Sequence, residues 1–541
     1  MSKSTIGQDL YVLPLGMAFA FGLTLLVGIL GTMNTLRPSN MALAQGVTIR
    51  YVAPTGNDNN NNCTNATAPC ATIQHAVDVA DLGDEIRVAA GTYTDVHTRP
   101  RKDINTTGIV TQVVYISQTL IIRGGYSTTD WDTPHLLTQT TTLDAQGQGR
   151  GLYIAGAISP TIEGLRITGG NAAGLVGDPS MFDAGGGVYI ISATVTLSNS
   201  HIFSNSAGAG GGLFVLNGQN ITLASNIIVS NTAGNRAGGL YFRNSPGARL
   251  TTNTIENNEA PNTGGGQESH GGILFLSSND AYLMGNRVIG NTAADQCGGI
   301  TFNGSENSKL VGNIVMGNHS GTSGFAINSS GGGLCFITSS GAYLSRNLVN
   351  HNSAYGHGGG LYVERSNMTM TNNVIADNQI LASKSFTGTG SGLHIAGSSP
   401  QLIHTTIARN SGGDGSGTYV TDIFSSFSHV AMTNTIIVDH VTGITVTTGN
   451  AATLNGVLWH NNGLNSSDMN TVIITKAYTG DPAFSADGYH LTDDSDAIDK
   501  GVNTAVSDDI DGEIRPSLAA PDLGADELCC LFYYLPVIFK E

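Results

Sequence analysis

The chain has 541 residues, only 12% of them charged, and a formal net charge of −17 at pH 7. A chain this acidic, with no row of lysines and arginines, is unsuited to nucleic acid, because it cannot neutralise phosphates. It would also repel acidic polymers of the pectate type unless a cation bridged the two. Glycine accounts for 72 residues, about twice its usual share.

Residues 1–44 have the features of a signal peptide. Lys3 precedes a mostly apolar run over residues 11–33, and Ala42-Leu43-Ala44 before Gln45 has the form of a signal-peptidase site. The apolar run is longer than usual, so an uncleaved anchor helix is the alternative interpretation. Both interpretations take the body across a membrane, and we expect an extracellular or cell-surface location.

Residues 45–148 are predicted to form an N-terminal cap and the first, less regular coils of a solenoid. Residues 47–52 alternate as a strand, and residues 72–80 form one short amphipathic helix. Such a helix suits the first coil, because an uncovered end exposes the core and the strand edges.

Six cysteines fit an exported protein. Cys63 and Cys70 bracket a polar loop, and we expect a disulfide between them. Cys297 precedes its repeat glycine by two residues, whereas Cys335 follows the next one by two. That offset is about 13 Å along a strand and predicts no bond between them. No cysteine spacing indicates zinc.

Residues 149–463 are built from one recurring unit. A glycine precedes an apolar–x–apolar triplet, and two asparagines follow, as in residues 360–378. The distance from the glycine to the second asparagine stays at 18 or 19 residues, whereas the return to the next glycine varies. A constant strand-bearing part with one elastic corner predicts a solenoid. The period-two alternation predicts strands, and hence an all-β parallel β-helix of about twelve to fourteen coils.

The asparagines are predicted to stack from coil to coil, because an asparagine amide can hydrogen-bond to the coils on both sides. The first expected ladder consists of Asn226, Asn253, Asn286, Asn313, Asn347 and Asn373. The second consists of Asn205, Asn231, Asn258, Asn291, Asn318, Asn352, Asn378 and Asn410.

A row of aromatic residues occupies the middle position of the triplet, which points away from the core. Coils stack about 4.8 Å apart, so these rings should form a lengthwise stripe, with the long corners as the wall of a groove. We hypothesise that the stripe binds carbohydrate; the alternative is that aromatic residues simply favour strands and stack on each other. The proposed binding residues are Tyr153, Tyr189, Phe214, Tyr241, Tyr362 and Tyr419.

Residues 464–527 are predicted to be an acidic C-terminal cap. Asp508, Asp509 and Asp511 are candidates for a Ca²⁺ site, since Ca²⁺ takes several oxygen ligands. The alternative is solvated acidic turns that complete the last coil, and no other cofactor is expected. Residues 528–541 form an apolar tail that is too short to span a bilayer as a helix.

Both ends of the body resemble a known family. Tyr51-Val52-Ala53, residues 71–77 and Gly91-Thr92-Tyr93, together with residues 509–516 and 521–527, resemble secreted bacterial right-handed β-helix proteins. That group includes pectate-lyase-like and choice-of-anchor surface proteins. The resemblance covers nearly all of residues 48–527 and implies a right-handed, single-stranded β-helix and export.

Two further segments carry separate resemblances. The Ile-x-x-Asn-x-Ala steps of the middle are similar to the repeats of polymorphic outer membrane proteins, which are surface adhesins. The tail resembles the Tyr-Leu-Pro tails of secreted proteins from filamentous green bacteria, which implies a sorting or attachment signal. A final strand packed against the cap is the alternative for the tail.

The expected function is adhesion or carbohydrate binding at the cell surface, by a monomer whose partner is a polysaccharide or surface glycan. The Asp-Asp pairs lie only in the predicted cap, and residues 150–463 contain two lysines, so no lyase or glycosidase constellation is visible. Catalysis is therefore not the preferred prediction. The alternatives are a polysaccharide lyase or glycoside hydrolase of pectate-lyase-like fold, and a purely structural surface protein.

Overall fold

The computed structural model describes residues 47–100, 108–175, 177–179, 182–263, 269–321, 329–383, 386–467 and 471–528. The predicted signal segment and the tail beyond Leu528 lie outside these ranges. The described residues from Thr48 onward belong to one compact unit. Within these ranges the strands form three sheets of 26, 14 and 8 strands, and the single helix is α2 (Ile73–Val79). No helix among them is long and apolar enough to cross a membrane.

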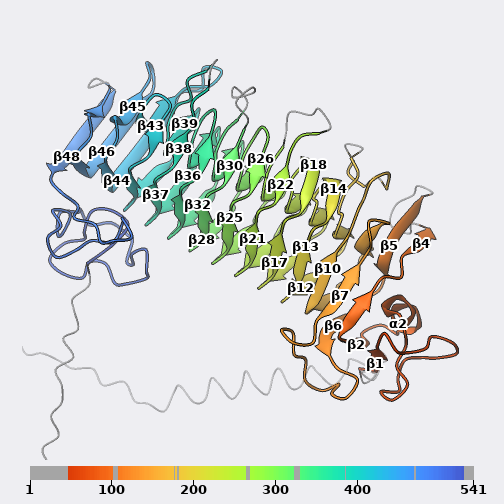
Figure 1. The fold of residues 1–541 in the computed structure, drawn as a ribbon. Helices are drawn as coiled ribbons and strands as arrows, with labels where there is room; N and C mark the ends of the chain where they lie inside the picture. The colour runs from red at the N-terminus through yellow and green to blue at the C-terminus, as the bar shows by residue number, and fades with distance from the viewer. Residues whose placement is uncertain are drawn as a thin grey trace, which may run out of the picture. The chain divides into compact units, whose positions relative to one another are not determined.

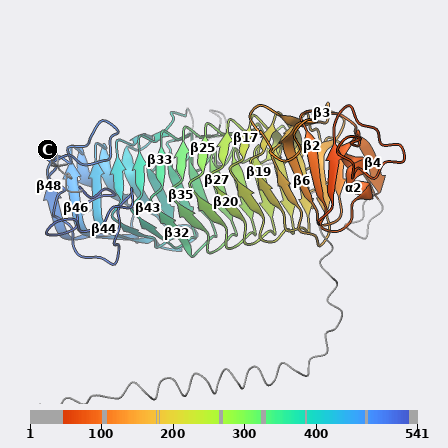
Figure 2. The same ribbon diagram turned by 90° about the horizontal axis from the view of Figure 1, so that it is seen from below.

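The strands wind into the stacked coils of a parallel β-helix (Figures 1 and 2). One regular coil contains β19 (Leu240–Arg243), β20 (Arg249–Thr251), β21 (Thr254–Glu256) and β22 (Glu259–Ala260). Each of these strands pairs in parallel with its counterpart in the next coil. The predicted fold class is therefore confirmed.

The 14-stranded sheet carries the triplet strand of every coil, and its first strand pairs antiparallel with the second. Besides β19 it contains β4 (His97–Pro100), β5 (Ile109–Ile116), β8 (Arg150–Ala155), β11 (Val188–Ile191), β15 (Leu213–Leu216), β23 (Ile273–Leu276), β27 (Ile300–Asn303), β31 (Leu334–Ile337), β35 (Leu361–Glu364), β39 (Leu393–Ala396), β43 (Ser416–Thr421), β45 (Thr442–Val446) and β47 (Leu464–Ser466).

The 26-stranded sheet takes two strands from most coils, and these merge into one long strand near the C-terminal end of the stack. Besides β20 and β21 it contains β1 (Ile49–Val52), β2 (Glu85–Ala89), β3 (Gly91–Tyr93), β6 (Ile121–Tyr126), β7 (Thr141–Asp144), β9 (Thr161–Glu163), β10 (Leu165–Thr168), β12 (Thr196–Ser198), β13 (His201–Phe203), β16 (Thr222–Ala224), β17 (Ile227–Val229), β24 (Tyr282–Met284), β25 (Arg287–Ile289), β28 (Lys309–Val311), β29 (Ile314–Met316), β32 (Ala342–Ser345), β33 (Leu348–Asn350), β36 (Met368–Thr371), β37 (Val374–Ala376), β40 (Gln401–Ile403), β41 (Thr406–Ala408), β44 (His429–Val438), β46 (Ala451–His460) and β48 (Val472–Thr479).

The eight-stranded sheet lies at the corner that varies in length. Besides β22 it contains β14 (Ser206–Ala209), β18 (Thr232–Arg236), β26 (Thr292–Ala293), β30 (His319–Ser320), β34 (Ser353–Ala354), β38 (Gln379–Ile380) and β42 (Ser411–Gly412).

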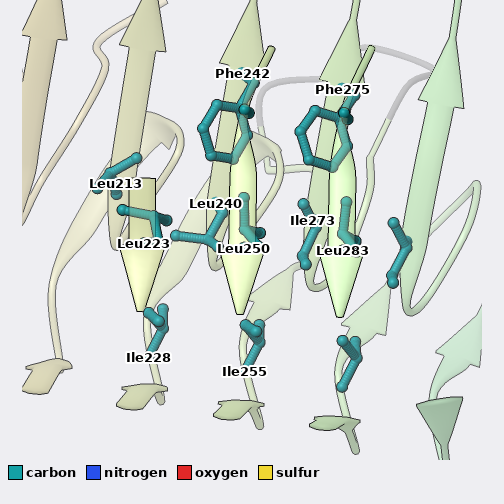
Figure 3. Packing of buried hydrophobic residues seen from close by; sticks show 14 of the residues in the cluster. Leu213, Leu223, Ile228, Leu240, Phe242, Leu250, Ile255, Ile273, Phe275 and Leu283 are labelled. Carbon is teal, nitrogen blue, oxygen red and sulfur yellow. The ribbon is translucent and has the colours of Figure 1, made fainter. Parts of the chain in front are cut away.

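The core of the solenoid is a set of apolar columns, one residue per coil. The two apolar positions of the triplet point inward, as Leu240 and Phe242 do, and meet inward residues of the large sheet such as Leu250 (Figure 3). Phe242 stacks on Phe275 with ring centres 4.8 Å apart, and Phe302 and Phe336 continue the column at 4.9 and 4.8 Å. Residues of the same type contact each other, because each coil places its residues directly over the equivalent residues of the preceding coil.

Both asparagine ladders form as predicted. Asn286 donates its backbone N–H and its Nδ2 to Oδ1 of Asn313, at 3.0 and 2.9 Å. Nδ2 of Asn286 also donates to the Leu250 carbonyl at 2.8 Å. The buried amide is therefore satisfied entirely by neighbouring coils, as a buried polar group requires.

The N-terminal end is closed by α2, close to the predicted position. Thr72 caps the helix by accepting the His75 backbone N–H, and Ile73, Ala76 and Val77 pack on the core. The buried Gln74 side chain bonds both the N–H and the C=O of Tyr115 in β5. This amide thus satisfies backbone groups at the strand edge, as a neighbouring strand would. Cys63 and Cys70 form the expected disulfide.

The C-terminal end differs from the predicted cap over 464–527. Strands β47 and β48 still pair with β45 and β46, so the coils continue to Thr479. Residues 480–528, which we call the lateral segment, lie beside the stack rather than over its end (Figure 1). Their buried residues Leu491, Leu523 and Ala525 pack on residues of β37, β41, β44 and β46.

Buried polar groups fix the lateral segment to the coils. Arg515 forms an ion pair with Glu527 at 3.1 Å, and both side chains are fully buried. Arg515 also donates to Nδ1 of His404, which follows β40, at 2.8 Å. Asn434 of β44 exchanges hydrogen bonds with Val502. None of these long-range partners is visible in the repeat pattern.

The prediction that Cys297 and Cys335 do not pair is wrong. They form a disulfide with Cα atoms 6.0 Å apart. Gly331, at the corner between them, has a φ of +60°, and a Cβ there would lie 3.1 Å from Cys297 Sγ and 2.2 Å from Cys335 Sγ. The chain turns back at this corner, so a distance measured along an extended strand does not apply.

Candidate functional site

The predicted aromatic stripe is present but is not an open groove. The rings stack from Tyr115 through Tyr153 to Tyr189, with centres 5.4 and 4.8 Å apart. Phe214 and Tyr241 extend the row at 5.5 and 4.9 Å. Tyr153 is 1% accessible and Tyr189, Phe214 and Tyr241 are 0% accessible. Four of the six proposed carbohydrate-binding residues therefore lie inside the protein.

The cover over this buried aromatic stripe comes from the corner that was predicted to be a groove wall. Phe182 and Ala184 pack on the stripe, and the Tyr189 hydroxyl donates to the Gly177 carbonyl at 2.9 Å. The buried Arg150 guanidinium lies 4.9 Å from the ring centre of Tyr189. The long corner folds over the rings because they offer it an apolar surface.

The C-terminal part of the stripe is also enclosed for the most part. Tyr362 is 8% accessible, His394 is buried, and Tyr419 is half-buried. The His394 ring stacks between those of Tyr362 and Tyr419, at 5.3 and 5.4 Å. Burial lowers the pKa of His394 well below its ordinary value and raises that of Tyr362. These groups therefore stay neutral, as interior residues do.

An exposed row of side chains instead crosses four coils on the outer face of the large sheet. Strands β20, β24, β28 and β32 pair in register, which places Arg249, Tyr282, Lys309 and Tyr343 side by side. We call these four residues the cation–aromatic ladder. Tyr343 is 36% accessible, Arg249 and Lys309 are exposed, and Tyr282 is half-buried. Unlike the buried aromatic stripe, the ladder can touch a ligand.

Cations and rings alternate along the ladder and hold one another in place. The Arg249 guanidinium lies 5.8 Å from the ring centre of Tyr282. The Lys309 ammonium lies between two rings, 6.0 Å from the centre of Tyr282 and 5.5 Å from that of Tyr343. Each such contact contributes about 0.5–1 kcal/mol at an exposed site. The two long cationic side chains are therefore partly ordered at the surface.

The ladder cations are not neutralised by the protein itself. Among the described residues, neither Arg249 nor Lys309 has an ion-pair partner, and the same holds for the exposed Arg287 on the neighbouring strand β25. By contrast, Arg409, which follows β41 of the same sheet, pairs with Asp377 at 2.9 Å. Although the chain has a net charge of −17, these three cations are not paired with a carboxylate in the described part of the chain. These unpaired cations can bind an anionic ligand.

The ladder could have been found from the repeat. Its members stand four residues before the first-ladder asparagines Asn253, Asn286, Asn313 and Asn347. The residues at that position in the flanking coils are Thr222 and Thr369. The sequence prediction covered only the outward position of the triplet strand and did not include this second outward position.

The three Ca²⁺ candidates do not share one site. Asp508 pairs with Arg346 of the solenoid at 3.3 Å. Asp509 is fully buried, and its carboxylate accepts backbone N–H groups of its own loop. Asp511 contacts His490, with Oδ2 2.5 Å from Nε2. The three carboxylates serve different partners, so a cation bound by all three would have to break these contacts.

His490 instead lies between two carboxylates, and a third is close. Nδ1 contacts Asp487 and Nε2 contacts Asp511, while an oxygen of the buried Asp526 lies within 4.8 Å of the ligand atoms of His490 and Asp511. Burial lowers the pKa of His490, but the hydrogen bonds to Asp487 and Asp511 outweigh it and raise the pKa to about 9. Burial raises the pKa of Asp526 to about 7.

Comparison with known proteins concerns the fold. A family model described as "Right handed beta helix region" matches residues 132–259 and 186–357. No curated protein matches the sequence. Among solved structures, the pectate lyase Pel9A is 15% identical with a TM-score of 0.32, covering 89% of this chain and 97% of its own.

Two further solved structures show comparable similarity. XylC in complex with xylose is 10% identical with a TM-score of 0.43, over 88% of this chain and 98% of its own. The A-module of the Azotobacter vinelandii mannuronan C-5 epimerase AlgE6 is 14% identical with a TM-score of 0.31, over 76% and 94%. Such values assign no activity. The stacked parallel coils, with a family-model match over residues 132–357, show that this chain has the fold of a right-handed parallel β-helix.

Proposed function

We propose that this protein binds an acidic polysaccharide along the cation–aromatic ladder. The observation that carries the proposal is the exposed, in-register row of Arg249, Tyr282, Lys309 and Tyr343, whose cations lack a carboxylate partner among the described residues. The proposed partner is a carbohydrate, as in the sequence prediction. The proposed binding surface is the outer face of the large sheet and not the buried aromatic stripe.

The spacing of the ladder suits an extended polymer. Coils repeat about every 4.8 Å, so Arg249 and Lys309 are about 10 Å apart, and so are Tyr282 and Tyr343. This distance is comparable with the length of a disaccharide unit, so a regular chain could present one acidic group to each cation. Uronate carboxylates and sulfates are both suitable anions, because guanidinium and ammonium groups bind oxyanions with charge-assisted hydrogen bonds.

The tyrosines add ring contacts that the two cations alone would not provide. The Tyr343 hydroxyl shares a hydrogen bond with Thr371 at 3.0 Å, and the Tyr282 hydroxyl contacts the Met284 sulfur at 3.2 Å. These contacts fix the ring tilt, and the exposed parts of the two rings can make van der Waals contacts with a sugar. Binding therefore needs little reordering of the surface.

The test measures binding of the chain from Gln45 onward to polygalacturonate, alginate and hyaluronan, with dextran and xylan as neutral polymers. The double variant R249Q/K309Q should weaken binding to the acidic polymers at least roughly tenfold, equivalent to about 1.4 kcal/mol. Added salt should weaken wild-type binding in the same way. The matched control is R365Q, because Arg365 is an exposed cation of the solenoid that is already paired with Glu364.

The same mixtures distinguish the alternative functions. New unsaturated or reducing ends would favour a polysaccharide lyase or glycoside hydrolase. Binding to none of the five polymers would favour a purely structural surface role. Equal binding by wild type and R249Q/K309Q would refute the ladder as the binding surface.

We also propose that the protein acts outside the cell or at its surface, where polysaccharides are accessible. The support is the signal-like sequence of residues 1–44. N-terminal sequencing of the protein from its native cells should give Gln45 as the first residue. An intact N-terminus in the membrane fraction would indicate an uncleaved anchor, and an intact chain in the cytoplasm would contradict export.

A further inference from the structure

We propose that the lateral segment holds a divalent-metal site whose ligands are His490, Asp511 and Asp526. This cluster belongs to a different part of the fold from the cation–aromatic ladder and does not depend on the proposed glycan binding. It also differs from the Ca²⁺ candidates named above, of which it retains only Asp511.

Three separate turns bring the donors together. His490 precedes Leu491, which bridges back to Phe484, and Asp511 lies in the turn closed by the bridge between Asp508 and Ile514. Asp526 is near the end of the lateral segment. The imidazole nitrogen and one oxygen from each carboxylate lie within 4.8 Å of one another. Ligand atoms about 2.0–2.2 Å from a tetrahedral ion lie about 3.4 Å from one another. Nε2 of His490 and Oδ2 of Asp511, which are 2.5 Å apart here, would therefore have to separate by side-chain rotation to admit the ion.

A second layer of contacts orients the histidine toward this point. Asp487 binds Nδ1 of His490, which leaves Nε2 to face Asp511 and Asp526. Asp487 is itself held by the backbone N–H groups of Tyr489 and His490 and by the Ser485 hydroxyl. A carboxylate on the far nitrogen of a histidine is the usual support of a metal-binding imidazole.

Asp526 supplies an independent observation. It is 5% accessible, and its Oδ2 accepts the Leu491 N–H at 2.7 Å. Its Oδ1 has no hydrogen-bond partner among the described residues. By contrast, both carboxylate oxygens of the neighbouring buried Asp522 accept backbone N–H groups. Oδ1 is not one of the fully buried atoms that lack a partner, so it reaches solvent and is available to bind a cation.

The donor set indicates the class of metal. One imidazole nitrogen and two carboxylate oxygens suit Zn²⁺ and related first-row divalent ions. Ca²⁺ and Mg²⁺ prefer oxygen ligands to an imidazole nitrogen. On binding, Nε2 loses its proton to solvent and forms a bond to the metal, and its hydrogen bond to Asp511 is replaced by metal coordination. The partly exposed positions of His490 and Asp511 leave room for a water as fourth ligand.

The experiment titrates the chain from Gln45 onward, after EDTA treatment and dialysis, with Co²⁺ followed by visible absorption and with Zn²⁺ followed by calorimetry. We expect one equivalent of metal, a tetrahedral Co²⁺ spectrum and an increase in the temperature at which the protein unfolds. His490→Gln should weaken binding by roughly 10- to 100-fold. Asp511→Asn tests the same site at an exposed position, where the substitution leaves the packing intact.

The matched control is His135→Gln. Nε2 of His135 lies 3.8 Å from Asp130, but this pair belongs to no three-ligand group among the described residues. The control should bind metal as wild type does. The proposal is overturned if wild type binds no Co²⁺ or Zn²⁺, if Ca²⁺ binds in preference to Zn²⁺, or if both His490→Gln and Asp511→Asn bind as tightly as wild type.

Discussion

Nε2 of His440 accepts two hydrogen bonds from Asn410, from the backbone N–H at 3.3 Å and from Nδ2 at 3.2 Å. These are the two bonds that asparagine Oδ1 accepts in the preceding coils, for example Asn410 Oδ1 from Asn378. An imidazole therefore ends the second asparagine ladder and acts as its last acceptor. This role requires neutral Nε2, and burial lowers the pKa of His440 to about 4.

Replacing His440 by asparagine should remove a pH-dependent loss of stability and leave the second asparagine ladder intact. The pKa of His440 in the folded state is below its ordinary value of 6.5. The contribution of His440 to the free energy of unfolding is therefore complete above pH 6.5 and is lost as the pH falls toward 4. At pH 5 the loss is about 2 kcal/mol. Urea unfolding should therefore give His440→Asn a stability close to wild type at pH 8 and a higher stability at pH 5.

His440→Ala is the companion variant. It removes the acceptor at every pH and leaves two buried donors of Asn410 unpaired, so it should cost about 1–3 kcal/mol at pH 8. The other histidines are common to wild type and both variants and cancel in the comparison. An identical pH dependence of unfolding in wild type and His440→Asn would contradict this account.

Asn313 tests the middle of the first ladder. Its side chain donates to Asn347 and to the Leu283 carbonyl and accepts two hydrogen bonds from Asn286. Asn313→Ala leaves several buried groups unpaired and should lower the free energy of unfolding by about 3 kcal/mol or more. Asn350→Ala is the control, because Asn350 is half-buried and its Oδ1 accepts no hydrogen bond among the described residues. Similar losses for both variants would contradict the ladder account.

The asparagine ladders could be predicted because the repeat alone places one asparagine over the next. Serines also stack from coil to coil for the same reason, but the sequence prediction did not include this serine ladder. Ser278 donates its backbone N–H to the hydroxyl of Ser305, which does the same to Ser339, at 2.9 Å in both cases. These serines stand six residues after their repeat glycines, so the signal was present. Short hydroxyl side chains are common at turns and draw less attention there than asparagine.

Features that depend on the corners and on the lateral segment could not be predicted. The repeat places Tyr189 on the outer side of its strand but contains no information on whether Phe182 folds over it. Similarly, the contact between His404 and Arg515 joins residues 111 positions apart through a segment without repeats. Such contacts depend on the path of irregular loops, which hydrophobic periodicity does not specify.

Tyr241 and Tyr282 should respond oppositely to truncation. Tyr241 is fully buried against Phe214, so Tyr241→Ala should cost about 3–5 kcal/mol of stability and leave polysaccharide affinity unchanged. Tyr282→Ala should change stability by less than about 1 kcal/mol, since its cation–π contacts are exposed. It should weaken binding to acidic polymers. Urea unfolding and affinity electrophoresis of both variants check the pair, and weaker binding by a stably folded Tyr241→Ala would point back to the aromatic stripe.

The Cys297–Cys335 disulfide can be tested by peptide mapping. After alkylation without reduction, a protease digest should contain one peptide that joins the two cysteines. Cross-linking residues 38 apart stabilises the fold by about 4 kcal/mol in the chain-entropy model, compared with about 2 kcal/mol for Cys63 and Cys70, which are 7 apart. Cys335→Ala should therefore lower stability more than Cys70→Ala. Recovery of both Cys297 and Cys335 as alkylated thiols would contradict the pairing.

The lateral segment should detach from the coils when Arg515 is replaced by an uncharged residue. Arg515 and Glu527 are fully buried, and removal of one partner leaves the other charge uncompensated, which typically costs about 3–5 kcal/mol. Arg515→Leu should therefore increase hydrogen exchange in residues 480–528 while the coils up to Thr479 stay protected. The double variant with Glu527→Leu should recover part of this protection, because no lone charge remains buried. Arg346→Gln is the control: its pair with Asp508 is largely solvated and should contribute less than about 1 kcal/mol. Loss of protection throughout the coils in Arg515→Leu would mean that the lateral segment and the solenoid unfold as one unit.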